Sequence, residues 1–293
     1  MKRRDFIKYS TASIILPSSI NMLNASTTTV EQQFFPIRVL NSLLGRKEKQ
    51  TVEKIEVQIE KKEIQKLEEI QKDVFVEDRY LDSFNSIRIK LKLVQNHVGY
   101  GNFNIIGFDE MLKIAKYSNK IESFNSLELE FLESIFYYDP SSHGFYGERI
   151  SQNITQIINK KEIIKIPRTG HYLFKGEPKE TYQRMKDDIG DSLTLTSGVR
   201  SIVKQTKLFL DKIHSVEGNI SIASKSLAPP AFTYHSIADF DVGKKGFGHA
   251  NFTSRFALTQ EFLKMRKLKY IDMRYTINNK DGVRYEPWHV KVI

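Results

Sequence analysis

The residues with the clearest capacity for chemistry lie in two clusters in the C-terminal half of the chain, at positions 233–241 and 286–289. Together they offer two imidazoles and several carboxylates, the side chains that hold zinc in hydrolytic sites. The chain has no cysteine, so a tight zinc site must use His, Asp or Glu. Three such ligands leave one coordination position for water, and the clusters therefore predict a hydrolytic metal centre.

The C-terminal cluster, Glu-Pro-Trp-His, is expected on a strand-like run. Glu286 and His289 would leave opposite faces of a regular strand, but a turn at Pro287 can bring them together. A Glu beside a ligand His need not bind the metal, because it can instead accept a proton from the attacking water. Trp288 is expected to pack on the other face. A buried His paired with a Glu on a purely structural strand is the alternative.

The other cluster contains His235, Asp239 and Asp241. These residues are an even number of positions apart, so their side chains would point to one face of an extended segment. Apolar residues surround them, and burying unpaired carboxylates there costs free energy that a cation would remove. One His and one Asp would complete a three-ligand site with His289. Parity alone leaves both aspartates open as the ligand.

A third segment, Leu-Thr-Ser-Gly-Val-Arg-Ser at positions 195–201, is expected to be a strand that ends in a glycine turn before a helix. Arg200 would stand at the exit of this strand, where its planar guanidinium can hold a carboxylate or a carbonyl oxygen. Gln205, one helical turn beyond Ser201, can reach the same site. A helix-capping turn with a surface Arg is the structural alternative.

The elements that must position these residues are predicted from apolar periodicity and turn signals. A charged helix is expected at 52–74, and further helices at 81–94, 108–115 and 127–137. After residue 164, short β-prone runs at 193–195 and 270–273 alternate with expected helices at 181–189, 202–213 and 253–265. This pattern predicts an α+β fold whose strands are not mainly parallel. Most aromatic residues between positions 131 and 146 are expected in the core rather than in a glycan groove.

The N-terminus, Lys-Arg-Arg-Asp-Phe-Ile-Lys at positions 2–8, resembles a twin-arginine export signal. The apolar stretch that follows is too weak for a spanning helix, so we expect export, removal of residues 1–25 and no stable membrane span. The chain carries a formal charge of +10, yet its basic residues are interleaved with acidic ones. Without a dense basic stripe, no nucleic-acid partner is expected. The positive charge favours a polyanionic or carboxylate-bearing partner, with a solvated surface that promotes solubility as the alternative.

Taken in their order along the chain, the three segments resemble the zinc D-alanyl-D-alanine carboxypeptidases, which are VanY-type and D-Ala-D-Ala dipeptidase-like metallopeptidases. The family order is Ser-Gly-x-Arg-Ser, then Ser-x-His with an Asp before Val-Gly, then Glu-x-Trp-His. The resemblance covers roughly residues 165–293. Thr233 replaces the usual Ser, the His-to-Asp spacing is one residue shorter, and Ala238 replaces a Gly. The Val-Gly that follows Asp241 favours this residue over Asp239.

The resemblance implies a zinc ion held by His235, Asp241 and His289, with Glu286 as general base and Arg200 on the substrate near the scissile amide. The further substrate contacts expected are Ser197, Ser201 and Gln205. The implied fold is α+β, a hedgehog/DD-peptidase-like zinc peptidase domain with a mainly antiparallel sheet, preceded by a helical N-terminal domain.

We therefore expect a signal peptide at 1–25, a helical accessory domain at 26–155 and a catalytic domain at 156–293. The expected protein is a periplasmic zinc metallopeptidase that hydrolyses the terminal D-Ala-D-Ala bond of peptidoglycan stem peptides. The alternatives are a D,D-endopeptidase, an L,D-carboxypeptidase and a cell-wall binding protein without turnover. A basic polyanion-binding protein, which would bind DNA in a salt-dependent manner without a metal, is a weaker alternative. The oligomeric state is unknown from sequence.

Overall fold

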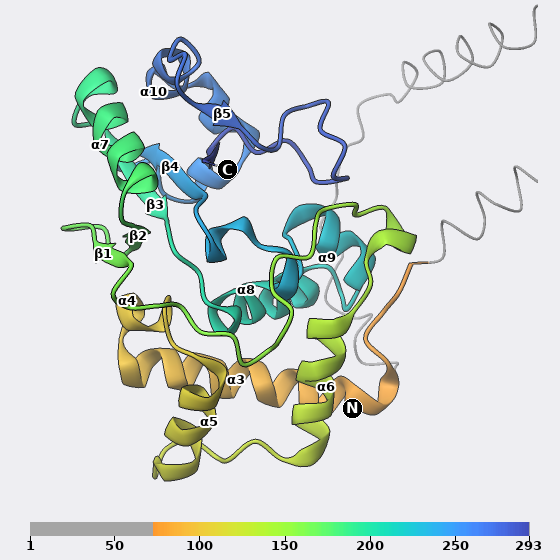
Figure 1. Cartoon of the computed structure of the whole chain (residues 1–293). Coiled ribbons are helices and arrows are strands. Elements are labelled where there is room, and N and C mark those ends of the chain that lie inside the picture. Colours follow the sequence, from red (N-terminus) through yellow and green to blue (C-terminus); the bar gives the residue numbers. More distant parts are fainter. Residues whose placement is uncertain (1–72, 293) are drawn as a thin grey trace, which may run out of the picture. The chain divides into compact units, whose positions relative to one another are not determined.

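The structure is a computed structural model that describes residues 73–292. The signal-like residues 1–25 and most of the charged helix expected at 52–74 lie outside this range. The described residues form one compact unit, and its elements are drawn in Figure 1. No helix within residues 73–292 is long and apolar enough to cross a membrane.

The first part of the described chain is helical, as predicted. Its elements are η2 (Asp78–Tyr80), α3 (Leu81–Val98), α4 (Tyr100–Phe103), α5 (Phe108–Tyr117), α6 (Ser126–Tyr137) and η3 (Ser141–His143). Apolar residues one helical turn apart on α3 are fully buried, as at Ile87, Leu91 and Val94. The start of α6 is fixed by a capping box, in which Asn125 and Glu128 exchange side-chain and backbone hydrogen bonds.

The second part mixes short strands and helices. Its strands are β1 (Ile163–Lys165), β2 (Tyr172–Phe174), β3 (Leu193–Ser197), β4 (Phe240–Lys244), β5 (Asp272–Met273) and β6 (His289–Lys291). Its helices are α7 (Glu177–Ile189), α8 (Ile202–Ser215), α9 (Ile220–Ser226) and α10 (Gln260–Met265), with short 3-10 turns η4 (Pro230–Phe232), η5 (Tyr234–Ser236), η6 (Gly248–Phe252) and η7 (Ser254–Leu258). The single helix expected at 253–265 is wrong, because Thr259 is extended between η7 and α10 and caps α10 through its side chain.

The sheets confirm the predicted α+β class. Strands β1 and β2 form a two-stranded sheet, and the four-stranded sheet has the order β3-β4-β6-β5. Every strand pair is antiparallel. The register between β3 and β4 shifts by one residue between Leu195 and Ser197, so that Ser197 pairs with Asp241 at the end of β3.

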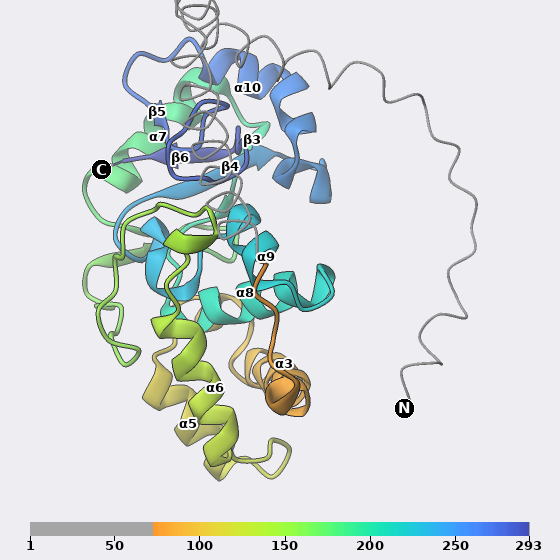
Figure 2. The ribbon, with the colours of Figure 1, turned by 90° about the vertical axis from the view of Figure 1, so that its right-hand side faces the viewer.

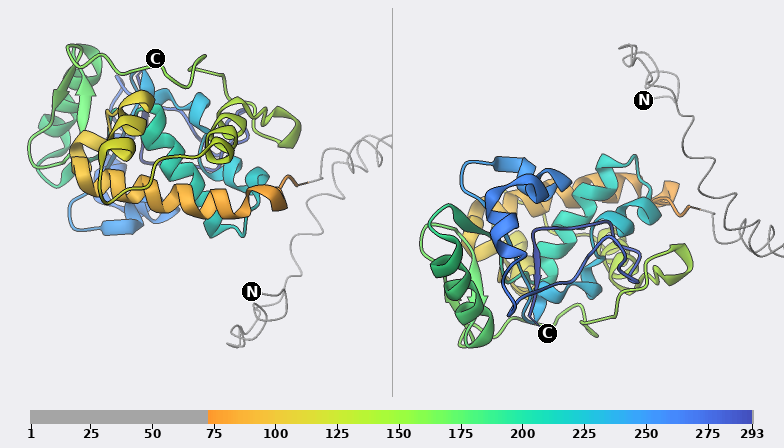
Figure 3. Two further views of the ribbon diagram at one scale, coloured as in Figure 1. Left: turned by 90° about the horizontal axis from the view of Figure 1, so that it is seen from below. Right: turned by 90° about the horizontal axis from the view of Figure 1, so that it is seen from above.

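Two apolar clusters hold the described chain together. One lies between the four-stranded sheet, α7 and α10, and it includes Phe240, Val242, Trp288 and Val290. The other joins α3, α5 and α6 to α8 and α9. Figures 1 and 2 show the sheet with α7 and α10 at one end of the molecule, and α8 and α9 between the sheet and the helices that precede residue 155. Seen from below in Figure 3, α3 lies across α8.

The aromatic residues at 131–146 mostly belong to the second apolar cluster, as predicted. Phe131, Phe136 and Phe145 are buried, whereas Tyr137 and Tyr146 are exposed. Because this cluster extends from α3 to α9, the helices before residue 155 cover one side of α8. The expected division into domains at residue 155 stays a prediction.

Candidate metal centre

The sheet places three of the predicted residues side by side. In the register of β3, β4 and β6, Ser197 pairs with Asp241, and Asp241 pairs with His289. Side chains alternate along a strand, so Phe240 and Val290 enter the apolar cluster while Asp241 and His289 point to the other face. Strand pairing thus brings together side chains that are far apart in sequence.

His235 reaches the same point from a turn rather than from a strand. The extended conformation expected for residues 235–241 is wrong at its start, since His235 lies in η5. The Thr233 side chain accepts a hydrogen bond from the His235 amide, and the amides of Ile237 and Ala238 both bond to the Tyr234 carbonyl. These local bonds satisfy the backbone without strand pairing.

The two histidines and Asp241 form a group that could hold a metal ion. Their candidate ligand atoms lie within 4.8 Å of one another. His235 Nε2 is 3.4 Å from Asp241 Oδ1, and His289 Nδ1 is 3.2 Å from the same oxygen. Both His235 Nε2 and Asp241 Oδ1 are buried and have no hydrogen-bond partner in the part of the chain that the structure describes. Buried polar atoms are normally satisfied, and two imidazole nitrogens with one carboxylate oxygen fit a catalytic zinc site.

The remaining nitrogen of each histidine is held by the protein. His235 Nδ1 lies 2.9 Å from the Gly198 carbonyl, and His289 Nε2 lies 2.9 Å from Asp239 Oδ2. These contacts leave His235 Nε2 and His289 Nδ1 directed at Asp241. The structure therefore groups Asp241, and not Asp239, with the two histidines.

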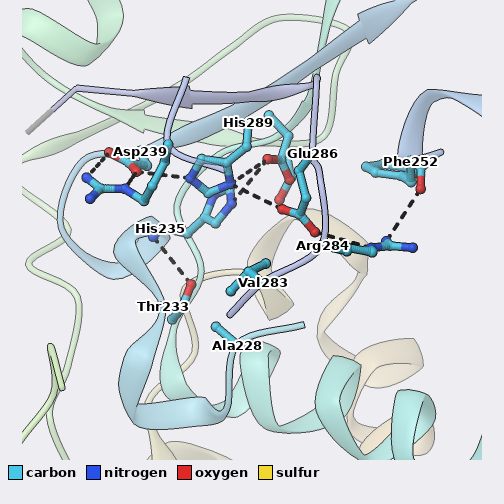
Figure 4. A network of polar contacts seen from close by, with 12 residues as sticks. Ala228, Thr233, His235, Asp239, Phe252, Val283, Arg284, Glu286 and His289 are labelled. Atoms are coloured by element: carbon cyan, nitrogen blue, oxygen red, sulfur yellow. Dashed lines mark hydrogen bonds and ion pairs between the residues drawn. The ribbon is translucent and has the colours of Figure 1, made fainter. Parts of the chain in front are cut away.

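Glu286 is brought to the site by the turn that precedes β6. The His289 amide donates to the Glu286 carbonyl at 3.2 Å, so residues 286–289 form a tight turn and only His289 begins the strand. The Glu286 carboxylate consequently lies 3.8 Å from His289 Nδ1. Figure 4 shows these two side chains next to each other. Trp288 packs into the apolar cluster on the other face, as predicted.

Arg200 is a buried member of the site. Only 8% of it is exposed, so the surface-Arg alternative is wrong. Its Nε donates to Ser197 Oγ at 2.7 Å, its Nη1 to Gln205 Oε1 at 3.4 Å, and its Nη2 to Asp241 Oδ2. Ser201 instead caps α8, and a substrate contact from this residue stays a prediction.

The charges of the site are strongly coupled. Burial and the nearby Arg200 guanidinium lower the pKa of His235 to about 4. Burial opposes protonation of His289 as well, but hydrogen bonds to Asp239 and Asp241 outweigh it and raise its pKa to about 9. Burial raises the pKa of Glu286 to about 7, and the Asp241 charge acts in the same direction. Near neutral pH the Glu286 carboxyl can thus either take up or release a proton.

A small pocket opens onto these groups, and some of the residues that line it were not predicted from the sequence. It is lined by His235, Glu286 and His289 together with Arg200, Gln205, Leu227, Ala228, Tyr275 and Val283. The ring of Tyr275 stands 4.8 Å from that of His289. The apolar wall residues carry no motif, because ordinary Leu, Ala and Val become pocket residues only through the fold.

The other histidines are dispersed. His171 is buried against the Tyr100 ring, at 5.6 Å between centroids, whereas His97, His214 and His249 are exposed. His143 stacks on Tyr138. None of them belongs to the group of possible ligands within the described residues.

The fold and site define a candidate metallopeptidase domain, in which His, Asp and Glu side chains converge on one pocket. Residues 177–293 match the model of the VanY family, D-alanyl-D-alanine carboxypeptidase. Over these residues the chain is similar to the VanY-type D-Ala-D-Ala peptidase family, which is a family of enzymes. No curated protein sequence matches the chain.

Solved structures with partial likeness include VanYB in complex with D-alanine-D-alanine, with 20% identity over 45% of this chain and 77% of that one and a TM-score of 0.36. The vancomycin-resistance D,D-dipeptidase VanXYg, bound to a D-Ala-D-Ala phosphinate analogue, has 19% identity over 51% and 62% of the two chains and a TM-score of 0.41. The LD-carboxypeptidase LdcB has 22% identity over 54% and 70% and a TM-score of 0.35. A further VanY structure, described as in complex with Zn(II), has 20% identity over 45% and 78% and a TM-score of 0.34.

Proposed function

We propose that the protein is an exported zinc D,D-carboxypeptidase that hydrolyses the terminal D-Ala-D-Ala bond of peptidoglycan stem peptides. The observation that carries this proposal is the pair of buried, unsatisfied atoms His235 Nε2 and Asp241 Oδ1, which face His289 Nδ1 beside a buried Glu286. Together with the family match over residues 177–293, this arrangement supports a hydrolytic metal centre.

His235, Asp241 and His289 would hold the zinc ion, as their donor set and burial allow. When bound, zinc supplies Lewis-acid polarisation of the scissile carbonyl and favours ionisation of water. The two histidine rings are already oriented for this role, because His235 Nδ1 contacts the Gly198 carbonyl and His289 Nε2 contacts Asp239.

Glu286 is proposed as the general base and Arg200 as the residue that stabilises the developing negative charge. The buried Glu286 carboxylate would take a proton from the attacking water and transfer it to the leaving amine. Arg200 Nη1 makes only a 3.4 Å contact with Gln205, so it can turn to the carbonyl oxygen of the substrate. In a buried site such a charge-assisted contact is strong.

The shape of the pocket supports a small substrate side chain. Leu227, Ala228 and Val283 form an apolar wall next to the polar groups, and a methyl group suits such a wall. Binding without turnover would need only the metal ligands. The presence of Glu286 beside them favours catalysis.

Export to the periplasm is proposed from the twin-arginine-like residues at the N-terminus. Replacing Arg3 and Arg4 together by Lys is expected to keep the protein in the cytoplasmic fraction. Equal amounts of parent and variant in the periplasm would contradict this route.

The variant Glu286→Gln tests the mechanism. It keeps the shape of the side chain but cannot accept the proton, so D-Ala release is expected to fall by a factor of roughly 100 to 10,000 while zinc content stays that of the parent protein. Glu133→Gln, on the exposed face of α6, is the matched control and should release D-Ala at the parental rate. If Glu286→Gln released D-Ala as fast as the parent, the proposed mechanism would be wrong.

A further inference from the structure

Asp239, the aspartate that is not grouped with the metal ligands, is completely buried and tightly held. Its Oδ2 accepts a hydrogen bond from Arg274 Nε at 2.5 Å and lies 2.9 Å from His289 Nε2. Its Oδ1 accepts from Arg274 Nη2 at 3.3 Å and from the Val292 amide at 3.0 Å. A carboxylate surrounded by donors in this way is fixed in orientation.

Arg274 also contacts the segment that carries the other histidine. Its guanidinium carbon lies 3.4 Å from the centre of the Tyr234 ring, and Tyr234 immediately precedes His235 in η5. The Tyr234 hydroxyl donates to Glu148 Oε2 at 3.1 Å. One arginine on the segment that follows β5 therefore touches both a partner of His289 and a neighbour of His235.

We propose that Asp239 and Arg274 are positioning residues for the metal centre. Asp239 accepts the Nε2 hydrogen of His289, which fixes the tautomer with a free lone pair on Nδ1, and Arg274 holds Asp239 while it packs on Tyr234. The inference rests on the proposed function, because it takes His235, Asp241 and His289 to be the metal ligands.

The same geometry separates positioning from direct ligation. Asp239 lies against the Nε2 atom of His289, whereas Asp241 and Glu286 lie against Nδ1. The two nitrogens are on different edges of the imidazole ring, so a metal ion near Asp241 is reached by Nδ1 and not by the Asp239 carboxylate. Carboxylate partners of ligand histidines typically contribute a factor of roughly 10 to 100 in metal affinity.

Zinc affinity provides the test, measured by competition with a chromophoric chelator on the purified protein and its variants. Asp239→Asn is expected to weaken zinc binding by a factor of roughly 10 to 100. Asp241→Asn, which alters a proposed ligand, should weaken it further. Arg274→Gln is expected to lower zinc affinity on the order of tenfold. Arg274→Lys should recover part of that affinity, because Lys keeps the positive charge but lacks the planar guanidinium that donates two hydrogen bonds to one carboxylate.

Two further observations separate positioning from a loss of fold. Nitrogen-15 NMR of the zinc-free protein at a pH above the titration of His289 should show the Nε2-protonated tautomer in the parent and a mixture of tautomers in Asp239→Asn. Arg88→Gln breaks another, more exposed Arg–carboxylate pair, with Asp211 at 3.2 Å, and should leave zinc affinity and tautomer unchanged.

The outcomes distinguish this inference from the proposed function. If the parent protein binds no zinc, the metal centre itself is refuted. If the parent binds zinc and Asp239→Asn retains both its affinity and its tautomer, only the positioning role is refuted. An Asp239→Asn loss as large as that of Asp241→Asn would also overturn it, since Asp239 would then act as a ligand.

Discussion

Lys204 offers a quantitative prediction, because it is a buried cation that pairs with no carboxylate among the described residues. Only 6% of the residue is exposed, and its ammonium has no hydrogen-bond acceptor among residues 73–292. It lies over the rings of Tyr100 and Phe103, at 4.9 and 5.8 Å, one helical turn beyond Arg200. Burial, and then repulsion by Arg200, lower the pKa of Lys204 from 10.5 to about 8.

The lowered pKa of Lys204 means that its charge reduces the free energy of unfolding over a defined pH range. The folded protein binds fewer protons than the unfolded chain between about pH 8 and pH 10.5, so the cost is complete below pH 8 and disappears as the pH rises through this range. A shift of this size corresponds to about 3 kcal/mol. Cation–π contacts with the two rings offset about 1 kcal/mol, which leaves a net cost of about 2 kcal/mol.

The variant Lys204→Met removes the charge and keeps a flexible apolar side chain against the rings. By urea denaturation, the variant should be more stable than the parent by about 2 kcal/mol at pH 7, and the difference should shrink at pH 9.5. Lys113→Met, on the exposed side of α5, is the control and should show little change at either pH. A variant less stable than the parent at pH 7, or a stability difference that grows with pH, would show that the charge of Lys204 does not destabilise the folded protein.

Three other predictions follow from particular contacts. Glu128→Gln breaks the buried ion pair with Lys90, at 2.7 Å, and should cost about 3 to 5 kcal/mol in urea denaturation; a loss below about 1 kcal/mol would contradict this burial argument. Gly198→Ala places a methyl carbon 2.0 Å from the Tyr172 carbonyl oxygen, so it should destabilise the protein by about 1 to 3 kcal/mol, and unchanged thermal unfolding would contradict it. Removal of zinc by a chelator should lower the unfolding temperature, whereas His289→Ala protein should not respond.

The sequence predicted which of these residues lie close together better than it predicted their conformations. His289 and Glu286 are adjacent, as their motif and Pro287 predicted, because a tight turn is a local property. His235 lies in a 3-10 turn and not in a strand, because the Thr233 cap and local backbone bonds prevailed over the alternation of residue types.

The choice between the two aspartates depended on distant parts of the chain. Asp239 and Asp241 are two positions apart and would lie on the same face of a strand, so their spacing does not show which of them is the ligand. Asp241 is aligned with His289 by pairing of β4 with β6, and Asp239 is engaged by Arg274, which is remote in sequence. Strand register and long-range ion pairs are not encoded in a local pattern.

The helices were the most predictable elements, since their apolar stripes repeat with helical period over α3, α5 and α6. The mixed strand and helix pattern of the second part also gave the correct class. The pattern did not predict the strand order β3-β4-β6-β5. It also did not predict the packing of α3, α5 and α6 on α8. Both depend on which apolar faces meet in three dimensions.

The proposed cleavage can be measured by mass spectrometry of a stem pentapeptide that ends in D-Ala-D-Ala, after incubation with the zinc-loaded protein. We expect the peptide to lose one C-terminal alanine, and to keep its mass when zinc is removed or when Glu286→Gln protein is used. An unchanged pentapeptide with the zinc-loaded parent protein, or release of an intact D-Ala-D-Ala dipeptide, would contradict a D,D-carboxypeptidase.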